Sequence, residues 1–91
     1  MIGSFKCADT EALFNGVRVP GFQQIEGVAR RKLMRLHAAA DMRDLKSPGS
    51  QPEKLAGKRA GQWSIRINDK WRLCFKWSNG RADGVEITDY H

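Results

Sequence analysis

The alternation of apolar and polar side chains in the second half of the chain is the feature that most constrains its fold. Residues 63–67 and 71–77 each place their apolar members on one side: Trp63, Ile65 and Ile67, then Trp71, Leu73, Phe75 and Trp77. A period of two is that of a half-buried strand. Asn68-Asp69-Lys70 turns the chain between them, and Asn79-Gly80 turns it again before a last strand through Val85 and Ile87. These segments predict an antiparallel meander with one apolar face.

A helical half precedes the strands and would cover that face. Residues 22–43 carry apolar side chains at intervals of three and four: Ile25, Val28, Ala29, Leu36, Ala39 and Ala40, with Leu33 at the edge of the stripe. Before them we expect a short first strand at Ile2–Lys6 and a brief helix, capped by Asp9 or Thr10, that runs to Phe14 and stops at Asn15-Gly16.

The fold class follows from these elements. A loop at residues 46–52, rich in proline, separates the two halves but is too short to imply two domains. The sequence therefore predicts one α+β domain over residues 1–91, a small and mostly antiparallel sheet packed on one face by a short and a long N-terminal helix.

The charge of the chain favours a polyanionic partner. Its 91 residues carry a net charge of +6, which suits nucleic acid but also suits a merely soluble basic protein. Arg31 and Arg35 lie one turn apart on the outer side of the long helix, as an RNA contact or as a solvated surface. Further cations gather in the sheet half: Lys54, Lys58, Arg59, Arg66, Lys70 and Arg72.

The strand period places Arg66 and Arg72 off the apolar face on adjacent strands. Guanidinium groups bind phosphate oxygens through two parallel contacts and stabilise the extra negative charge of a phosphoryl transition state. The tryptophans could stack on bases, but their strand positions favour packing in the core.

Several classes of site are not indicated. Cys7 and Cys74 lack a CxxC spacing or a histidine cluster, so they read as reduced, partly buried thiols and not as a disulfide framework or a zinc site. His37 has no partner at catalytic or metal spacing and is interpreted as structural or solvated. We expect no metal and no cofactor. Neither a signal peptide nor a stretch long enough to cross a membrane is visible, so we expect a cytoplasmic protein.

The triplet Asp89-Tyr90-His91 follows the last predicted strand and is either a polar end or a site of proton transfer. RNA cleavage without a metal needs a base for the 2′-hydroxyl proton, cations around the pentacoordinate phosphate and an acid for the 5′-oxygen. These roles can be divided among the triplet and Arg72, with Glu53 as a further candidate.

The chain contains six motifs in this order: Met1-Ile2-x-Ser4-Phe5, Asp44-Leu45-x-Ser47-Pro48, Lys54-Leu55-x-Gly57-x-Arg59-x-Gly61-Gln62-x-Ser64-Ile65-Arg66-Ile67-Asn68, Trp71-Arg72-x-Cys74-Phe75-x-Trp77, Val85-Glu86-Ile87 and Asp89-Tyr90-His91. With them the chain resembles HigB-type toxins of the RelE superfamily, from bacterial toxin–antitoxin pairs. The resemblance implies the RelE-like fold and a metal-independent endoribonuclease that cleaves translated mRNA in the ribosomal A site. It also implies a HigA-type helix-turn-helix antitoxin, through which the complex binds operator DNA.

By position, the resemblance assigns His91 as the acid/base, Tyr90 and Asp89 as orienting groups, and Arg72 as the group that stabilises the scissile phosphate. Some relatives have a histidine and a lysine where this chain has Glu53 and Ala56. Glu53 is then either a replacement base or a solvated carboxylate. Two alternatives stay open: a non-enzymatic inhibitor of DNA gyrase, as in ParE-like relatives, and a simple RNA-binding module on the same fold.

Overall fold

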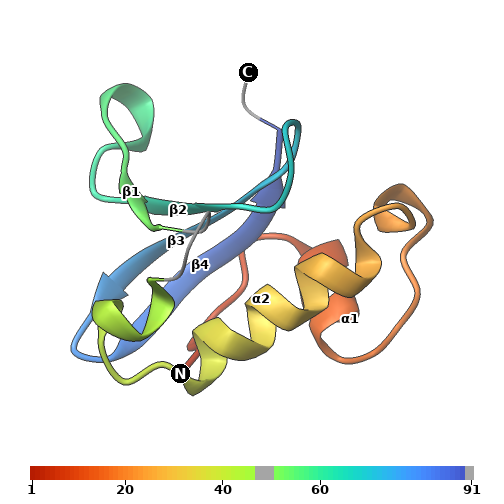
Figure 1. The fold of residues 1–91 in the computed structure, drawn as a ribbon, viewed down its shortest axis with the longest axis horizontal. Coiled ribbons are helices and arrows are strands. Elements are labelled where there is room, and N and C mark those ends of the chain that lie inside the picture. The colour runs from red at the N-terminus through yellow and green to blue at the C-terminus, as the bar shows by residue number, and fades with distance from the viewer. Residues whose placement is uncertain (47–50, 90–91) are drawn as a thin grey trace.

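The computed structural model describes residues 1–46 and 51–89 of the chain. Its helices and strands, labelled in Figure 1, are α1 (Ala8–Phe14), α2 (Glu26–Ala38), β1 (Glu53–Lys54), β2 (Trp63–Arg66), β3 (Arg72–Ser78) and β4 (Arg81–Thr88). Short 3₁₀ turns occur at Pro20–Phe22, Met42–Leu45 and Gly57–Arg59. No helix among the described residues combines the length and apolarity that a membrane span requires.

The strands form one antiparallel sheet in the order β1-β2-β3-β4. The predicted meander is confirmed for β2, β3 and β4. The two-residue strand β1 is an addition, because its backbone pairs with the first half of β2 at Glu53↔Ser64 and Lys54↔Trp63. Polar residues with no alternation gave no sign of this strand.

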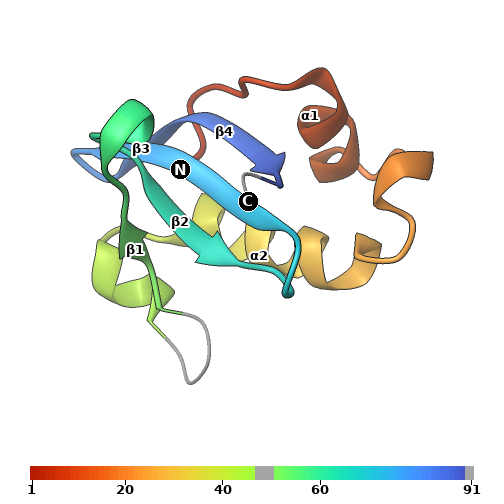
Figure 2. The same ribbon diagram turned by 90° about the horizontal axis from the view of Figure 1, so that it is seen from above.

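One face of the sheet packs against α2, and Figures 1 and 2 show the helix on the side of the sheet opposite the β1–β2 connection. The side chains that meet between them are fully buried: Leu33, Leu36, Leu73 and Phe75. Each buried leucine contributes about 1.5–3 kcal/mol to folding. The predicted α+β class is confirmed. Leu33 lies at the centre of the apolar stripe and not at its edge, because it continues the four-residue step from Ile25 and Ala29.

The long helix is shorter than predicted at both ends. Residues 22–43 do not form one helix, since a 3₁₀ turn ends at Phe22 and α2 begins only at Glu26. At the other end Ala39 is extended, with φ −70° and ψ 131°. There the Asp41 carboxylate accepts a hydrogen bond from the Arg43 N–H at 2.9 Å, and this capping interaction starts a separate 3₁₀ turn.

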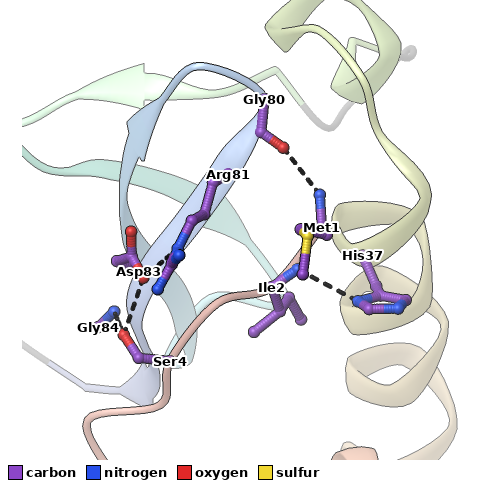
Figure 3. A network of polar contacts seen from close by, with 8 residues as sticks. All are labelled: Met1, Ile2, Ser4, His37, Gly80, Arg81, Asp83 and Gly84. Atoms are coloured by element: carbon purple, nitrogen blue, oxygen red, sulfur yellow. Dashed lines mark hydrogen bonds and ion pairs between the residues drawn. The ribbon is translucent and has the colours of Figure 1, made fainter.

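The segment Ile2–Lys6 runs along the outer edge of β4 but is not the regular strand that we predicted. Only two isolated parallel bridges form, Ile2↔Ala82 and Phe5↔Val85. Between them the Ser4 hydroxyl accepts a hydrogen bond from the Gly84 N–H at 2.9 Å, so a side chain takes the place of a backbone acceptor at this position (Figure 3). Gly84 has a φ of +60°, next to a register shift between β3 and β4, and this irregularity breaks the run.

Short polar contacts complete the edge of β4 and the start of the chain. Helix α1 begins after Cys7, so neither Asp9 nor Thr10 is its cap; Thr10 is buried, and its hydroxyl accepts the Ile87 N–H at 3.0 Å. The predicted stop at Asn15 is confirmed. His37 is structural, as one of its two interpretations predicted, because its Nδ1 accepts the Ile2 N–H at 3.1 Å (Figure 3).

Candidate functional site

The face of the sheet that α2 leaves uncovered, which we call the helix-free face, carries the two arginines singled out by the sequence. Directly paired residues in an antiparallel sheet point to the same side. The row Ile65↔Leu73↔Ile87 is buried against α2, so the next row, Arg66↔Arg72↔Thr88, points the other way. The structure therefore brings Arg66 and Arg72 side by side on neighbouring strands.

Two like charges directly opposite each other disfavour folding by a few tenths of a kcal/mol up to about 1 kcal/mol. Arg66 forms an ion pair with Asp69 in the following turn, whereas Arg72 forms none among the described residues. A half-buried guanidinium without a carboxylate beside it retains its capacity to bind an anion. This row is thus suited to a phosphate group.

The last strand delivers the start of the terminal triplet to the same place. Thr88 pairs with Arg72, and Asp89, which is exposed, follows it immediately. Tyr90 and His91 lie outside the described residues. The register of β4 therefore carries the chain past the arginine row at the point where the triplet begins.

Strand β1 contributes the other carboxylate. Glu53 pairs with Ser64, so it shares the helix-free face, two residues from the Arg66 row, or about 7 Å along the strand. Glu53 and Lys54 are both exposed, and so is Lys58 in the 3₁₀ turn that follows. The sheet thus brings together Glu53, Arg66 and Arg72 from three strands and Asp89 from the end of the fourth, although they span 37 positions of sequence.

Arg59, by contrast, forms polar contacts with side chains of the protein itself. Its Nη1 lies 2.9 Å from Oε1 of Glu86 and donates to Oε1 of Gln62 at 3.2 Å. Glu86 was not among the candidate residues, although the period of β4 already placed it on the polar side. Beneath the pair lies Cys74, fully buried, and this burial raises the pKa of its thiol to about 11.

The cations of α2 join those of the sheet. Burial and the neighbouring charges of Arg35, Arg66 and Arg31 lower the pKa of Lys32. The effect of Arg66 on Lys32 means that β2 and α2 contribute to one positive surface. Within it Arg31 is exposed and Arg35 donates a hydrogen bond to the Asp44 carbonyl at 3.1 Å.

The remaining aromatic and charged candidates have simple surroundings. Lys70 lies over the ring of Trp71, with 5.2 Å between Nζ and the ring centre, in the β2–β3 turn. All three tryptophans are partly buried against the core, which confirms the packing interpretation. Within residues 1–46 and 51–89, no three His, Cys, Asp or Glu side chains form a group that could hold a metal ion.

Comparison with known proteins shows the family to which the chain belongs. Residues 18–91 match the HigB-like toxin family, described as the RelE-like toxin of type II toxin–antitoxin system HigB. The chain is 34% identical over its full length to the full length of "Endoribonuclease HigB" from Proteus vulgaris. It is 42% identical over 67 residues, which are 72% of this chain and 66% of the relative, to "Toxin HigB-1" from Vibrio cholerae.

The fold is also that of solved toxin structures. The toxin in a YoeB–YefM toxin–antitoxin complex from Staphylococcus aureus superimposes with a TM-score of 0.61 at 21% identity, over 100% of this chain and 98% of that one. The YoeB dimer from the same organism gives 0.60 at 23% identity, over 99% and 94%. Taken together, the family match and the full-length relative establish that the chain belongs to the HigB-like toxins of the RelE superfamily.

Proposed function

We propose that this protein is a ribosome-dependent endoribonuclease that acts in the cytoplasm and inhibits translation by cutting mRNA in the A site. One structural observation carries the proposal: Arg66 and Arg72 lie side by side on the helix-free face, where β4 ends and Asp89 begins. The full-length relative named as an endoribonuclease supports the same chemistry.

In the proposed reaction the 2′-oxygen of one nucleotide attacks its own 3′-phosphorus while the 5′-oxygen of the next nucleotide leaves. The products are a 2′,3′-cyclic phosphate and a 5′-hydroxyl. His91 exchanges the protons, and Tyr90 and Asp89 orient it or the attacking hydroxyl. Arg72 stabilises the charge of the pentacoordinate phosphate, which is typically a large part of such catalysis. Glu53 is the second candidate for proton transfer. No metal is required, because the arginine row supplies the positive charge.

The cations around this site hold the RNA. Arg66 continues the row of Arg72, Lys54 and Lys58 follow Glu53, and Lys70 lies in the adjoining turn. On α2, Arg31 and Arg35 extend the positive surface toward ribosomal RNA. Each phosphate that these side chains neutralise releases counterions, so binding depends on salt.

We further propose a HigA-type helix-turn-helix antitoxin as partner, through which the complex binds operator DNA. The family description names a toxin–antitoxin system, and the YoeB structures include complexes with the antitoxin YefM. Coexpression with a HigA-type antitoxin encoded beside the toxin should give one complex on a sizing column and restore growth.

Mapping mRNA ends during expression without antitoxin tests the proposed activity. We expect new 5′ ends within translated codons, and none in messages whose start codon has been removed. Slow growth with intact mRNA and gyrase-dependent DNA breaks would instead identify an inhibitor of the ParE kind. Tight RNA binding with no cleavage would identify an RNA-binding module.

A further inference from the structure

The connection between β1 and β2 contains only a 3₁₀ turn and irregular segments, but backbone hydrogen bonds hold it in a defined shape. The Leu55 N–H donates to the Gln62 carbonyl at 2.9 Å, and the Gln62 N–H donates to the Arg59 carbonyl at 3.0 Å. Gly57 and Gly61 adopt positive φ angles of 64° and 89°, which favour glycine at both bends. Figure 1 shows this loop on the side of the sheet opposite α2, which is the side of the arginine row.

Among the described residues, the ion pair between Arg59 and Glu86 ties the loop to the far strand. Arg59 belongs to the loop, whereas Glu86 belongs to β4, and β2 and β3 lie between β1 and β4 in the sheet order. The row Ser64↔Cys74↔Glu86 places Glu86 on the helix-free face. Arg59 therefore reaches across Ser64 and Cys74, which are 2% and 0% exposed.

The pair is partly protected from solvent. The side chain of Arg59 is 25% exposed and that of Glu86 is 14% exposed, at 2.9 Å from each other. Lys6 approaches the same Glu86 oxygen at 3.7 Å but is 60% exposed, so it adds a weaker contact. Removing Glu86 takes this carboxylate from the half-buried Arg59, whereas removing Arg59 leaves Glu86 with only the exposed Lys6 as a counter-charge.

We propose that Glu86 is a positioning residue for RNA cleavage: through Arg59 it holds the loop, with Glu53, Lys54 and Lys58, at a fixed place beside Arg72. This inference rests on the proposed function. It also changes the role of Arg59, which acts through Glu86 and not as a direct contact to RNA. The row of the pair adjoins the arginine row, so a shift of the loop displaces the groups that flank the phosphate.

The two roles for Arg59 predict opposite effects of Glu86→Gln. If Arg59 bound phosphate directly, loss of the neighbouring carboxylate would free its guanidinium and strengthen RNA binding. If Glu86 holds the loop, the same change lowers kcat/KM by on the order of tenfold or more, since a displacement of about 1 Å can cost about 100-fold. Asp83→Asn is the matched control. It removes the same charge from β4, at the more exposed ion pair with Arg81, whose atoms also lie 2.9 Å apart.

The decisive measurement is cleavage of mRNA on programmed ribosomes by purified variants, after thermal unfolding has shown that each is folded. Arg59→Ala and Glu86→Ala should each reduce kcat/KM, and the double variant should be no worse than either, because both remove one tether. The exchanged pair, Arg59→Glu with Glu86→Arg, should recover most of the activity. Amide exchange at Leu55 and Gln62 should be faster in the single variants, by about tenfold or more, without faster exchange at Leu73 in the core.

Three outcomes overturn the assignment: Glu86→Gln as active as Asp83→Asn, additive losses in the double variant, or an exchanged pair that stays inactive. The proposed function has a separate failure, because wild-type protein that leaves ribosome-bound mRNA intact would refute the activity itself. Wild-type cleavage that Glu86→Gln matches would refute only the positioning role.

Discussion

At the scale of single residues, the surroundings of each ionisable group decide what it can do. Arg72 faces Arg66 across the β2–β3 pair and has no carboxylate partner in the described chain, whereas Arg59 is paired with Glu86. Arg72 can therefore bind an anion, whereas the charge of Arg59 is already neutralised by Glu86. From sequence both arginines counted among the cations of the sheet half, because charge and strand period do not reveal which carboxylate a guanidinium will contact.

Arg72→Ala should leave a folded protein that cleaves mRNA on the order of 100- to 1000-fold more slowly, as expected for loss of one group that stabilises a developing charge. Arg72→Lys should recover part of this loss, since lysine keeps the charge but not the two-point geometry. Single-turnover cleavage on ribosomes measures the effect. Lys76→Ala, on the exposed part of the same strand, is the control and should stay near wild type.

His91→Ala should be impaired by about 10²- to 10⁴-fold, the usual contribution of a positioned acid or base. His91→Gln should be nearly as slow, because an amide can form hydrogen bonds but cannot exchange a proton near neutral pH. Wild-type rates in folded His91→Ala would transfer the proton-handling role to Glu53 and Tyr90.

Cys74 offers a test of the packing under the Arg59–Glu86 pair. Burial raises the pKa of its thiol to about 11 from an ordinary 9.0, so iodoacetamide at pH 8 should label the half-buried Cys7 and spare Cys74. The folded state holds this proton more tightly than the unfolded chain. Its contribution to stability is therefore complete below pH 9 and is lost as the pH rises to about 11. Equal labelling of both thiols in native protein, read by mass spectrometry, would contradict this packing.

At the scale of elements, the strongest periodic signals gave the right structures and the weak ones did not. The runs that became β2, β3 and β4 alternate over several residues, and each buries apolar side chains in the core that the sheet shares with the helices. The bounds of α2 were missed because Asp41 and Asp44 start a competing turn that the apolar stripe does not register. Glu53 and Lys54 were assigned to no strand, since their strand arises only from pairing with β2.

Candidate site residues could likewise be placed from sequence only where a local periodic pattern determines their position. Arg66 and Arg72 could be placed on a polar face from their strand period, and their juxtaposition needs only the register of a tight turn. The contact between Arg59 and Glu86 joins residues 27 positions apart across two intervening strands, and no local pattern contains it. The closeness of Lys32 to Arg66 likewise depends on how α2 crosses the sheet.

The exposed cations of helix α2 should contribute to ribosome binding and not to the rate of cleavage. Arg31→Ala removes an exposed cation outside the arginine row and should weaken ribosome affinity while kcat changes little. It should also reduce the slope of log affinity against log salt by about 1 for each phosphate that Arg31 neutralises in the wild type. Arg18→Ala removes an exposed charge that precedes α2 and serves as control. An unchanged KM for Arg31→Ala would exclude this face of the helix from RNA binding.

At the scale of the whole molecule, the core and the helix-free face of the sheet have different roles. The core between α2 and the sheet fixes the strand register, and the helix-free face displays the groups that the register aligns. The chain carries a net charge of +6, and the positive charge of Arg66 on β2 lies close enough to Lys32 on α2 to lower the pKa of that lysine. In the proposed mechanism a long-range positive potential draws the protein to RNA, and the arginine row then selects the phosphate at which chemistry occurs.

The chemistry of the whole protein is tested by the ends that it leaves on RNA. An attack by the 2′-oxygen gives a 2′,3′-cyclic phosphate and a 5′-hydroxyl, so the 3′ fragment should accept phosphate from a polynucleotide kinase without prior dephosphorylation. If Arg66 and Arg72 supply the positive charge at the scissile phosphate, as we propose, cleavage should persist when EDTA removes trace transition metals while free magnesium is held constant to keep ribosomes intact. Direct formation of 5′-phosphate ends would mean that water, and not the 2′-hydroxyl, is the nucleophile. Loss of cleavage under EDTA with restoration by one added metal would assign the charge stabilisation to that ion and leave the arginine row with a binding role alone.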